Sequence, residues 1–278
     1  FHIKMFNIDI YSNEKKYEIT EKTIEWNGRI LHQIKALKDF GNVKTGRLGG
    51  WIEKESNLSQ EGDCWVFNDA IVCDDAKVYE GALIYNNAQV RDHAEVFWKS
   101  VIKGNACIYD NAKVFGNVVI KDRVEVWGNA VIYEYARLYG NVIVYNNAQV
   151  YDHAAIYSNA RISGYAQVGG NTIVFDDAQV CGYTKIYEDA KIYGDVKVFG
   201  NAEIRGNARV NSNSNYAVLQ NFCGNCRFMT WTQSNDMWCV DCFYGTGKEL
   251  IEKAYRLGKK YGEKCETMIK AVEVINSI

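Results

Sequence analysis

The sequence predicts an all-β solenoid, a triangular parallel β-helix built from 18-residue coils. From Val66 to Val210, every sixth residue is Val, Ile or Leu, 25 times in succession. The fourth residue after each of these is Ala in 17 of 24 hexads. The chain also contains no proline, which suits a backbone whose N–H groups must nearly all be paired. A period of six is typical of a coil that stacks on its own next turn, whereas a β-sandwich would show a period of two.

Each position of the hexad has a physical role. The aliphatic residue, position one, points inward, and the small residue at position five points inward where the coil narrows. Position three is Gly, Asn or Asp in 19 of 24 hexads, and these residues tolerate positive φ and suit a bend. Three strand-and-bend units close one triangular turn, so 24 hexads predict eight coils and a rod of roughly 38 Å.

The segments before the repeats are expected to close the N-terminal end of the solenoid, because solenoid ends expose unpaired strand edges. Residues 1–50 contain alternating apolar and polar stretches around Asn27-Gly28, which predicts a capping hairpin. The β-helix is expected over 51–210. Ile52 and Leu58 belong to an earlier coil that is out of register with Val66, so two residues are inserted near Cys64.

Residues 211–245 predict a small four-cysteine module that binds structural Zn²⁺. Two C-x2-C pairs are separated by twelve residues, and four thiolates from two tight turns can meet one tetrahedral ion. Two disulfides or four free thiols are the alternatives. Nine cysteines, an odd number, favour reduced thiols, and Cys73 and Cys181 are predicted about 29 Å apart, too far for a disulfide. The predicted ligands are Cys223, Cys226, Cys239 and Cys242.

Residues 246–278 predict an amphipathic helix of about 30 residues. Thr246 and Glu249 form a capping box, and apolar residues then recur every three to four positions up to Ile275. This helix could dock along the rod or bundle with copies of itself, and docking is the favoured arrangement.

Charge and composition argue against several classes of function. The net charge is −2, and residues 51–210 carry 15 Lys/Arg against 21 Asp/Glu, which gives no basic field for nucleic acid. No apolar run approaches the roughly 20 residues that span a bilayer, and the first residues lack a signal-peptide layout. We therefore expect a cytoplasmic protein with no membrane partner.

The residues ahead of the repeats carry a specific resemblance. They include Asp39-Phe40-Gly41, Gly49-Gly50-Trp51, Asn57-Leu58-Ser59-Gln60 and Gly62-Asp63-Cys64-Trp65-Val66. Together with the hexads, they resemble YdcK-like bacterial and prophage proteins of the hexapeptide-repeat, LpxA-like superfamily, over about residues 31–210. The resemblance implies a left-handed β-helix and trimers, and in the enzymes of that class a histidine base at a subunit boundary. Residues 211–278 are outside it.

Histidines are the only candidate catalytic residues in the coils, and they are weak ones. His93 and His153 lie in similar contexts, each at position four of a bend. They are ten hexads apart, which places them on neighbouring corners and more than three coils apart. They cannot share a metal or a substrate within one chain, and each fits a solvated bend residue better than a general base. No phosphate-binding loop or nucleophile elbow is present.

The outward residues of the hexads suggest a contact surface. Position two is aromatic in 16 of 24 hexads, and residues 18 apart share a face. One face alternates aromatic with charged residues, as in Lys77 and Tyr79, and is expected to be solvated. Another face has a higher apolar content at its outward positions than the other two. It is predicted to contact a second copy of the chain, the C-terminal helix or another protein, through Leu83, Tyr85, Val101, Val119, Tyr139, Tyr157, Ile173 and Phe175.

Three functions follow from the sequence. The favoured hypothesis is a non-enzymatic interaction scaffold that binds itself, as a trimer or dimer, or a host protein, as a prophage modulator of a host defence system would. The second is an acyltransferase that uses acyl-CoA and His93 or His153. The third, nucleic-acid binding, is disfavoured by a net charge of only +1 after residue 210, and its candidates are Arg227, Trp231, Trp238, Lys259 and Lys260.

Overall fold

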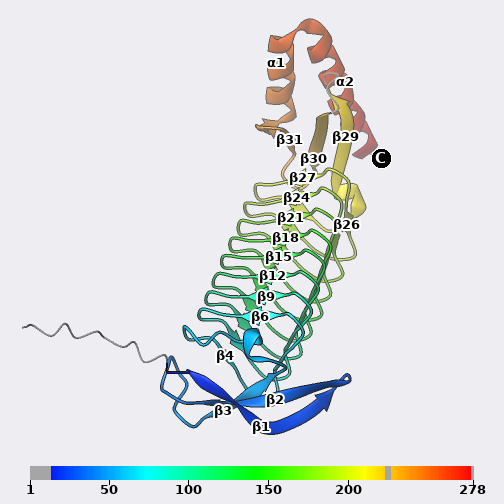
Figure 1. Ribbon diagram of the computed structural model, residues 1–278. Coiled ribbons are helices and arrows are strands. Elements are labelled where there is room, and N and C mark those ends of the chain that lie inside the picture. The colour runs from blue at the N-terminus through cyan, green and yellow to red at the C-terminus, as the bar shows by residue number, and fades with distance from the viewer. Residues whose placement is uncertain (1–13, 223–226, 277–278) are drawn as a thin grey trace, which may run out of the picture.

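The computed structural model describes residues 14–222 and 227–276 of the chain. It is a solenoid of about nine coils, with a hairpin across its N-terminal end and a small sheet with two helices at its C-terminal end (Figure 1). The β-solenoid prediction is confirmed. None of the helices that the structure describes combines the length and apolar character needed to cross a membrane.

The solenoid has three parallel sheets, which we call faces A, C and D. Face A continues from β3 (Leu48–Ile52) through β5 (Ile71–Val72), β8 (Gln89–Val90), β11 (Cys107–Ile108), β14 (Glu125–Val126), β17 (Ile143–Val144), β20 (Arg161–Ile162), β23 (Gln179–Val180) and β26 (Lys197–Val198). Face C holds β6 (Lys77–Val78), β9 (Glu95–Val96), β12 (Lys113–Val114), β15 (Val131–Ile132), β18 (Gln149–Val150), β21 (Gln167–Val168), β24 (Lys185–Ile186) and β27 (Glu203–Ile204). Face D holds β4 (Trp65–Val66), β7 (Leu83–Ile84), β10 (Val101–Ile102), β13 (Val119–Ile120), β16 (Arg137–Leu138), β19 (Ala155–Ile156), β22 (Ile173–Val174), β25 (Lys191–Ile192) and β28 (Arg209–Val210).

From β4 onward, residues eighteen apart pair in these sheets, whereas β3 pairs with β5 at a separation of twenty. Val101 pairs with Val119 on face D, and Val131 with Gln149 on face C. Three hexads therefore close one turn, as the sequence predicts. The position-one residues are buried and form one continuous core with the position-five alanines.

Every bend uses the left-handed backbone conformation at position three. All 24 of these residues, from Asn68 to Gly206, have positive φ. Side chains at this position also bond the next coil: Asp110 Oδ2 accepts a hydrogen bond from Gly128 N at 3.0 Å. The chemical preference at position three is therefore explained by both conformation and capping.

Outward side chains form ladders along the rod. On face C the rings of Tyr79, Phe97, Phe115, Tyr133 and Tyr151 stack in series, with centroids 4.8–5.4 Å apart. At the corners, asparagine amides donate to the asparagine one coil on, as Asn141 does to Asn159 at 2.9 Å. Such pairs stabilise neighbouring strands.

A hairpin covers the N-terminal end. β1 (Tyr17–Trp26) and β2 (Arg29–Ala36) pair antiparallel, and β2 pairs with β3. The turn residues Asn27 and Gly28 have φ of 49° and 75°, the combination that a two-residue hairpin requires. The first coil also contains η1 (Glu55–Asn57), and its Leu58 bridges to Val78, twenty residues on, which locates the two-residue insertion.

The C-terminal module is a four-stranded antiparallel sheet covered by two helices. After η2 (Asn213–Asn215) come β29 (Tyr216–Phe222), β30 (Arg227–Thr232), β31 (Met237–Val240) and β32 (Phe243–Thr246). In place of one helix of about 30 residues there are two, α1 (Gly247–Leu257) and α2 (Lys259–Asn276). The chain breaks at Gly258, whose φ of 139° is open to glycine alone among common residues. The helices pack on the sheet around Trp238 and Ile269 rather than along the rod.

Candidate functional site

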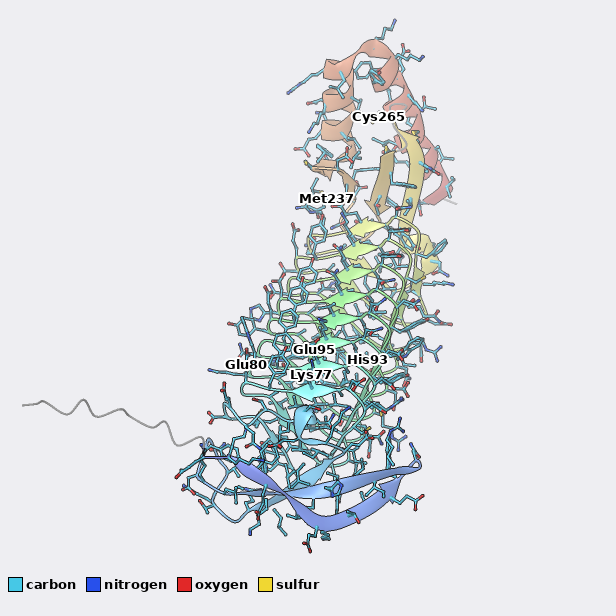
Figure 2. All side chains as sticks on the ribbon, viewed as in Figure 1. Lys77, Glu80, His93, Glu95, Met237 and Cys265 are labelled. Carbon is cyan, nitrogen blue, oxygen red and sulfur yellow. The ribbon has the colours of Figure 1, made fainter. Side chains whose placement is uncertain are left out.

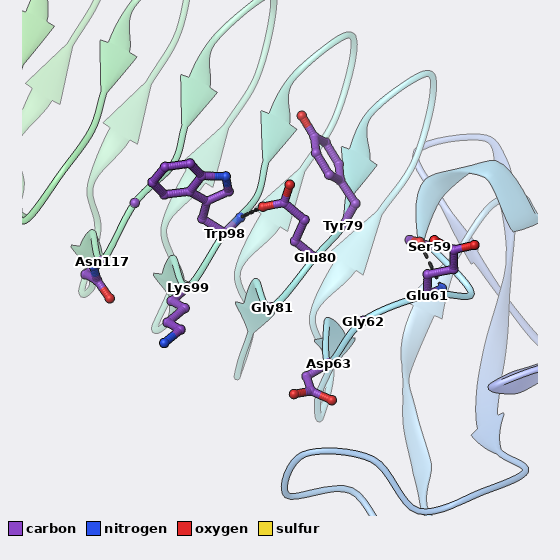
Figure 3. A pocket seen from close by; sticks show the side chains of 11 residues that line it. Ser59, Glu61, Gly62, Asp63, Tyr79, Glu80, Gly81, Trp98, Lys99 and Asn117 are labelled. Carbon is purple, nitrogen blue, oxygen red and sulfur yellow. Dashed lines mark hydrogen bonds between the residues drawn. The ribbon is translucent and has the colours of Figure 1, made fainter.

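A large cavity lies at the corner between faces C and D, on the coils nearest the hairpin. We call it the corner groove, and its volume is about 710 Å³. Tyr79, Glu80 and Trp98 project on one side of the corner, and Asp63, Lys99 and Asn117 on the other (Figure 3). Its full lining is Ser59, Glu61, Gly62, Asp63, Tyr79, Glu80, Gly81, Trp98, Lys99, Gly116 and Asn117.

The groove exists because of the residues at position three of successive coils. Gly62, Glu80, Trp98 and Gly116 follow one another at intervals of eighteen, all with positive φ. A Cβ on Gly62 would lie 2.3 Å from Glu80 O, so glycine keeps the coils in contact and leaves the space outside them open. The Trp98 side chain bounds the groove on the side nearer the C-terminus.

Trp98 is unusual in its backbone conformation. Its φ is 59°, a conformation that is rare for a bulky residue and is most often retained at functional positions. Its side chain is also 55% exposed, and its indole meets Phe115 edge-on with centroids 6.4 Å apart. The backbone N–H of Trp98 donates to Glu80 Oε2 at 3.0 Å (Figure 3).

The groove is negatively charged. Glu61, Asp63 and Glu80 line it, against one cation, Lys99. Among the residues that the structure describes, none forms an ion pair with any of these four. A recess of about 300 Å³ on the face D side shares Asp63, Gly81 and Lys99 with the groove and continues it to Gly41, Val43 and Phe67.

His93 lines a separate, smaller recess of about 270 Å³ with Ser56, Asp75, Lys77 and Glu95. Figure 2 shows Lys77, His93 and Glu95 together on the coils near the hairpin. His93 Nδ1 is 3.6 Å from Asp75 Oδ2. A hydrogen bond from Lys54 holds the pKa of Asp75 below its usual value. An imidazole beside a carboxylate can act as an oriented base.

Glu95 in that recess is also ionised. Burial alone would raise its pKa, but hydrogen bonds from Tyr79 and Lys113 lower it. Burial, with the hydrogen bond to Glu95, raises the pKa of Tyr79. The Tyr79 hydroxyl lies 2.9 Å from Glu95 Oε2, so this pair connects the recess to the corner groove.

His153 is far from His93, as predicted. It follows β18 on face C, whereas His93 follows β8 on face A. Its ring stacks on Tyr135 with centroids 4.9 Å apart. The structure therefore does not bring the two histidines together.

The predicted interface residues share one face. All eight lie in or directly after strands of face D. Each is half-buried by its neighbours in adjacent coils, so the side chains are less exposed than the sequence alone suggested. Tyr157 and Phe175 stack with centroids 5.1 Å apart. Whether a second molecule covers this face stays a prediction.

The candidate metal ligands are described only in part. Cys223 and Cys226 lie outside the described residues. Cys239, in β31, is buried beside Glu203 and Arg205, and Cys242 is exposed in the turn before β32. None of the seven cysteines that the structure describes forms a disulfide.

The tryptophans considered for nucleic-acid binding are unsuited to it. Trp231 and Trp238 are buried in the core between the sheet and the helices, with ring centroids 6.4 Å apart. Neither can stack on a base without opening that core. Lys259 and Lys260 are exposed on α2, and the side chain of Arg227 lies outside the described residues.

One further group of possible metal ligands is already bound by an arginine side chain. Ligand atoms of Glu53, Cys73 and Asp74 lie within 4.8 Å of one another. The Arg29 guanidinium binds both carboxylates, bonding to Asp74 and lying 3.9 Å from Glu53. Arg29 belongs to β2, so this cluster fixes the hairpin to the first coils.

Comparisons with known proteins identify the repeat. Residues 136–152 match the family model described as the YdcK β-solenoid repeat. The coils of this chain are therefore similar to that repeat. A stretch of 39 residues is also 49% identical to an Escherichia coli (strain K12) protein named "Uncharacterized acetyltransferase YdcK". That stretch is 14% of this chain and 12% of the relative, so the match concerns a short part of each protein.

Sequence reasoning missed the corner groove of this YdcK-like chain, although one signal was present. Trp98 is the only aromatic residue at position three of the 24 hexads. At a position that otherwise holds Gly, Asn, Asp, Glu or Ser, a bulky ring indicates a constraint other than folding.

Proposed function

We propose that this YdcK-like chain is a binding protein rather than an enzyme, and that its stiff prism presents the corner groove to a partner protein. The observation that carries this proposal is the groove itself, where an exposed tryptophan in a costly backbone conformation stands beside charges without ion-pair partners. The prophage setting that the family resemblance implies makes a host protein the expected partner.

The regularity of the coils supports a scaffold. From β4 to β28 the strands follow one another at a spacing of six, with no inserted loop. Because every coil bonds to the next, the prism holds its outer surface rigid, and rigid presentation lowers the entropic cost of binding. Enzymes of the hexapeptide-repeat class, by contrast, shape their pockets with loops that interrupt the coils.

A comparison of two aromatic variants tests the proposal. Trp98→Ala should abolish retention of a partner from host extract, whereas Tyr165→Ala should not. Tyr165 is a matched control because it is 53% exposed, against 55% for Trp98, and lies on a different corner. Equal loss of the same protein with both variants, or with neither, would contradict binding through the groove.

Self-association through face D is a separate proposal. Its support is the set of half-buried apolar side chains Leu83, Val101, Val119 and Ile173, in a row that the exposed Arg137 interrupts. The double variant Leu83→Lys, Ile173→Lys should lower the mass measured by light scattering to that of one chain. An unchanged mass would remove self-association through this face.

An acyltransferase is the second candidate. Its support is the printed name of the Escherichia coli relative and the imidazole–carboxylate pair of His93 and Asp75. Acetyl-CoA should then bind with a measurable heat in calorimetry, and His93→Ala should abolish acetyl transfer while His153→Ala leaves it intact. Absence of acetyl-CoA binding to the unsubstituted protein would exclude this candidate.

We also infer that the C-terminal module holds structural zinc through Cys223, Cys226, Cys239 and Cys242. Its support is the register of the sheet: Phe222 pairs with Arg227 and Val240 with Phe243. Since β30 and β31 are antiparallel neighbours, both C-x2-C segments adjoin the same end of the sheet. Zinc would crosslink the two hairpins there, and Cys239 would exchange its contact with Glu203 for the ion.

Elemental analysis of the purified protein tests the zinc proposal. One zinc per chain is expected, and Cys242→Ser should lower this content, whereas Cys181→Ser in the solenoid should not. A metal-free protein with unchanged thermal stability would contradict it.

A further inference from the structure

We infer that the corner groove recognises an arginine side chain in an exposed basic segment of the partner protein. This rests on the proposed binding function and names the chemistry that the groove selects. Three features of the molecule support it: a guanidinium site elsewhere on the same corner, the charges that line the groove, and the size of the groove.

The same corner of the prism binds a guanidinium six coils further along. Tyr187 and Glu188 occupy positions two and three of a face C hexad, as Tyr79 and Glu80 do. There the Arg205 guanidinium lies over the Tyr187 ring at 5.0 Å and donates to Glu188 Oε1 at 2.6 Å. This Tyr-Glu arrangement is therefore able to hold an arginine side chain.

The two sites also share their hydrogen bonding to the backbone. Glu188 Oε2 accepts from Gly206 N at 2.7 Å, and Glu80 Oε2 accepts from Trp98 N at 3.0 Å. In each case one carboxylate oxygen is used by the next coil. At Glu188 the second oxygen binds Arg205, whereas Glu80 Oε1 has no partner among the residues that the structure describes.

In the corner groove, a different residue occupies the position that Arg205 has at the Tyr187–Glu188 site. Eighteen residues after Tyr79 comes Phe97, whose ring stacks on Tyr79 with centroids 4.8 Å apart, so the chain itself provides no guanidinium. Trp98 provides an exposed indole instead, and indole is the ring that attracts cations most strongly. On other parts of the rod the chain's own cations lie over some rings, as Arg91 does over Tyr109 at 4.1 Å and Lys121 over Tyr139 at 4.4 Å.

The lining charge favours a cationic ligand. Three carboxylates, Glu61, Asp63 and Glu80, face the cavity with one cation, Lys99. A guanidinium binds a carboxylate through two parallel hydrogen bonds and stacks on aromatic rings, which an ammonium does less well. We therefore assign arginine rather than lysine.

The size of the groove favours a peptide over a free amino acid. Its volume of about 710 Å³, continued by a recess of about 300 Å³, exceeds the space that one side chain fills. The residues on either side of the arginine would lie along the corner, toward Asn117 or toward Gly41.

A peptide titration followed by two-dimensional NMR tests the inference. The probe is acetyl-Gly-Arg-Gly-amide, and its neutral control is the same peptide with citrulline, which keeps the shape and removes the charge. The arginine peptide should shift the backbone amide of Trp98 and those of its neighbours, saturating in roughly the millimolar range. The citrulline peptide and free arginine should bind at least about tenfold more weakly.

Variants locate the site. Glu80→Gln should weaken binding about tenfold, since it removes a charge-assisted bond. Trp98→Ala should weaken it about fivefold. Asp195→Asn, an exposed carboxylate on another corner, should leave binding unchanged. Equal binding of the citrulline peptide, or full binding by Glu80→Gln, would overturn the arginine assignment.

The outcome also separates this inference from the proposed function. If the arginine peptide does not bind, yet retention of the partner still depends on Trp98, the groove binds a different chemistry and only the arginine assignment falls. If neither the peptide nor the partner depends on Trp98, both fall.

Discussion

Among single residues, Trp98 is where the requirements of folding and of the proposed binding differ. The left-handed conformation costs an ordinary L-residue about 1–2 kcal/mol, and 23 of the 24 bends use Gly or a small or acidic residue there. A tryptophan is retained in spite of this cost, and its exposed ring contributes little to the core.

The strain at Trp98 leads to a stability prediction. Trp98→Gly should change the free energy of unfolding by less than about 1 kcal/mol, because relief of strain offsets the lost contact with Phe115. Tyr165→Gly should lower the free energy of unfolding by about 2 kcal/mol. It removes the stacking contact with Tyr183, and the glycine adds backbone entropy to the unfolded chain. A larger loss for Trp98→Gly than for Tyr165→Gly in thermal unfolding would show that Trp98 has a structural role.

Asp39 gives a pH prediction at the same scale. Hydrogen bonds from Lys44, and from the backbone and hydroxyl of Thr45, lower its pKa from 3.8 to about 2. Because the folded-state pKa is lowered, its contribution to stability is complete above pH 3.8 and is lost as pH falls through about 2. The carboxyl carbon in NMR should titrate near pH 2 and shift upward in Lys44→Gln. A midpoint near 3.8 would mean that the loop bonds are absent in solution.

At the scale of elements, the N-terminal cap depends on one buried ammonium. Lys16 is 1% exposed, and its Nζ donates to the carbonyl oxygens of Glu61, Gly62 and Cys64 at 3.0–3.2 Å. These carbonyls belong to the irregular first coil. Burial lowers the pKa of Lys16, and the nearby Cys64 and Asp63 oppose this.

Removing that ammonium should loosen the cap. Lys16→Met keeps the volume of the stem but leaves three carbonyls without this donor, at a cost of roughly 2–4 kcal/mol. Hydrogen exchange should speed up in β1 and β2 and stay unchanged in the central coils. Lys35→Met, which removes an exposed ion pair with Glu18, is the control. Equal effects of the two substitutions would contradict the role of Lys16.

The elements differ in how far the sequence predicts them. The sequence predicts the coils from one repeated pattern and the capping hairpin from Asn27-Gly28. Both predictions depend only on residues that are close together in the sequence. The four-stranded sheet from Tyr216 to Thr246 has no such signal, since its short strands are fixed by packing against α1, α2 and the last coil. The break at Gly258 was missed because the apolar spacing continues across it.

The site was harder to predict than the fold. The relative positions of His93 and His153 could be predicted from the eighteen-residue coil alone. The corner groove exists where small outward residues leave space, as Gly62, Gly81 and Gly116 do around Trp98. The size of that space depends on coil-to-coil distances, which the period of the sequence does not give.

At the scale of the whole molecule, the coil length has a counter-intuitive consequence. Deleting residues 123–140 removes eighteen residues and joins Asp122 to Asn141 in register, so the shortened protein should keep its circular dichroism and unfold only slightly earlier. Deleting the nine residues 123–131 should be far more damaging, because it turns Tyr133 and Tyr135 inward and the aliphatic column outward. A nine-residue deletion as stable as the longer one would contradict the geometry.

We propose that a rigid prism binds its partner protein at one corner. Site-specific photo-crosslinking tests this proposal, with the photoreactive residue p-benzoyl-phenylalanine replacing Lys99 in the groove or Asn105 on the next corner of the same coil. One dominant cross-linked partner is expected from Lys99, lost when Trp98→Ala is added, and none is expected from Asn105. Cross-links of equal yield from both positions, or cross-links from Lys99 that persist in Trp98→Ala, would contradict it.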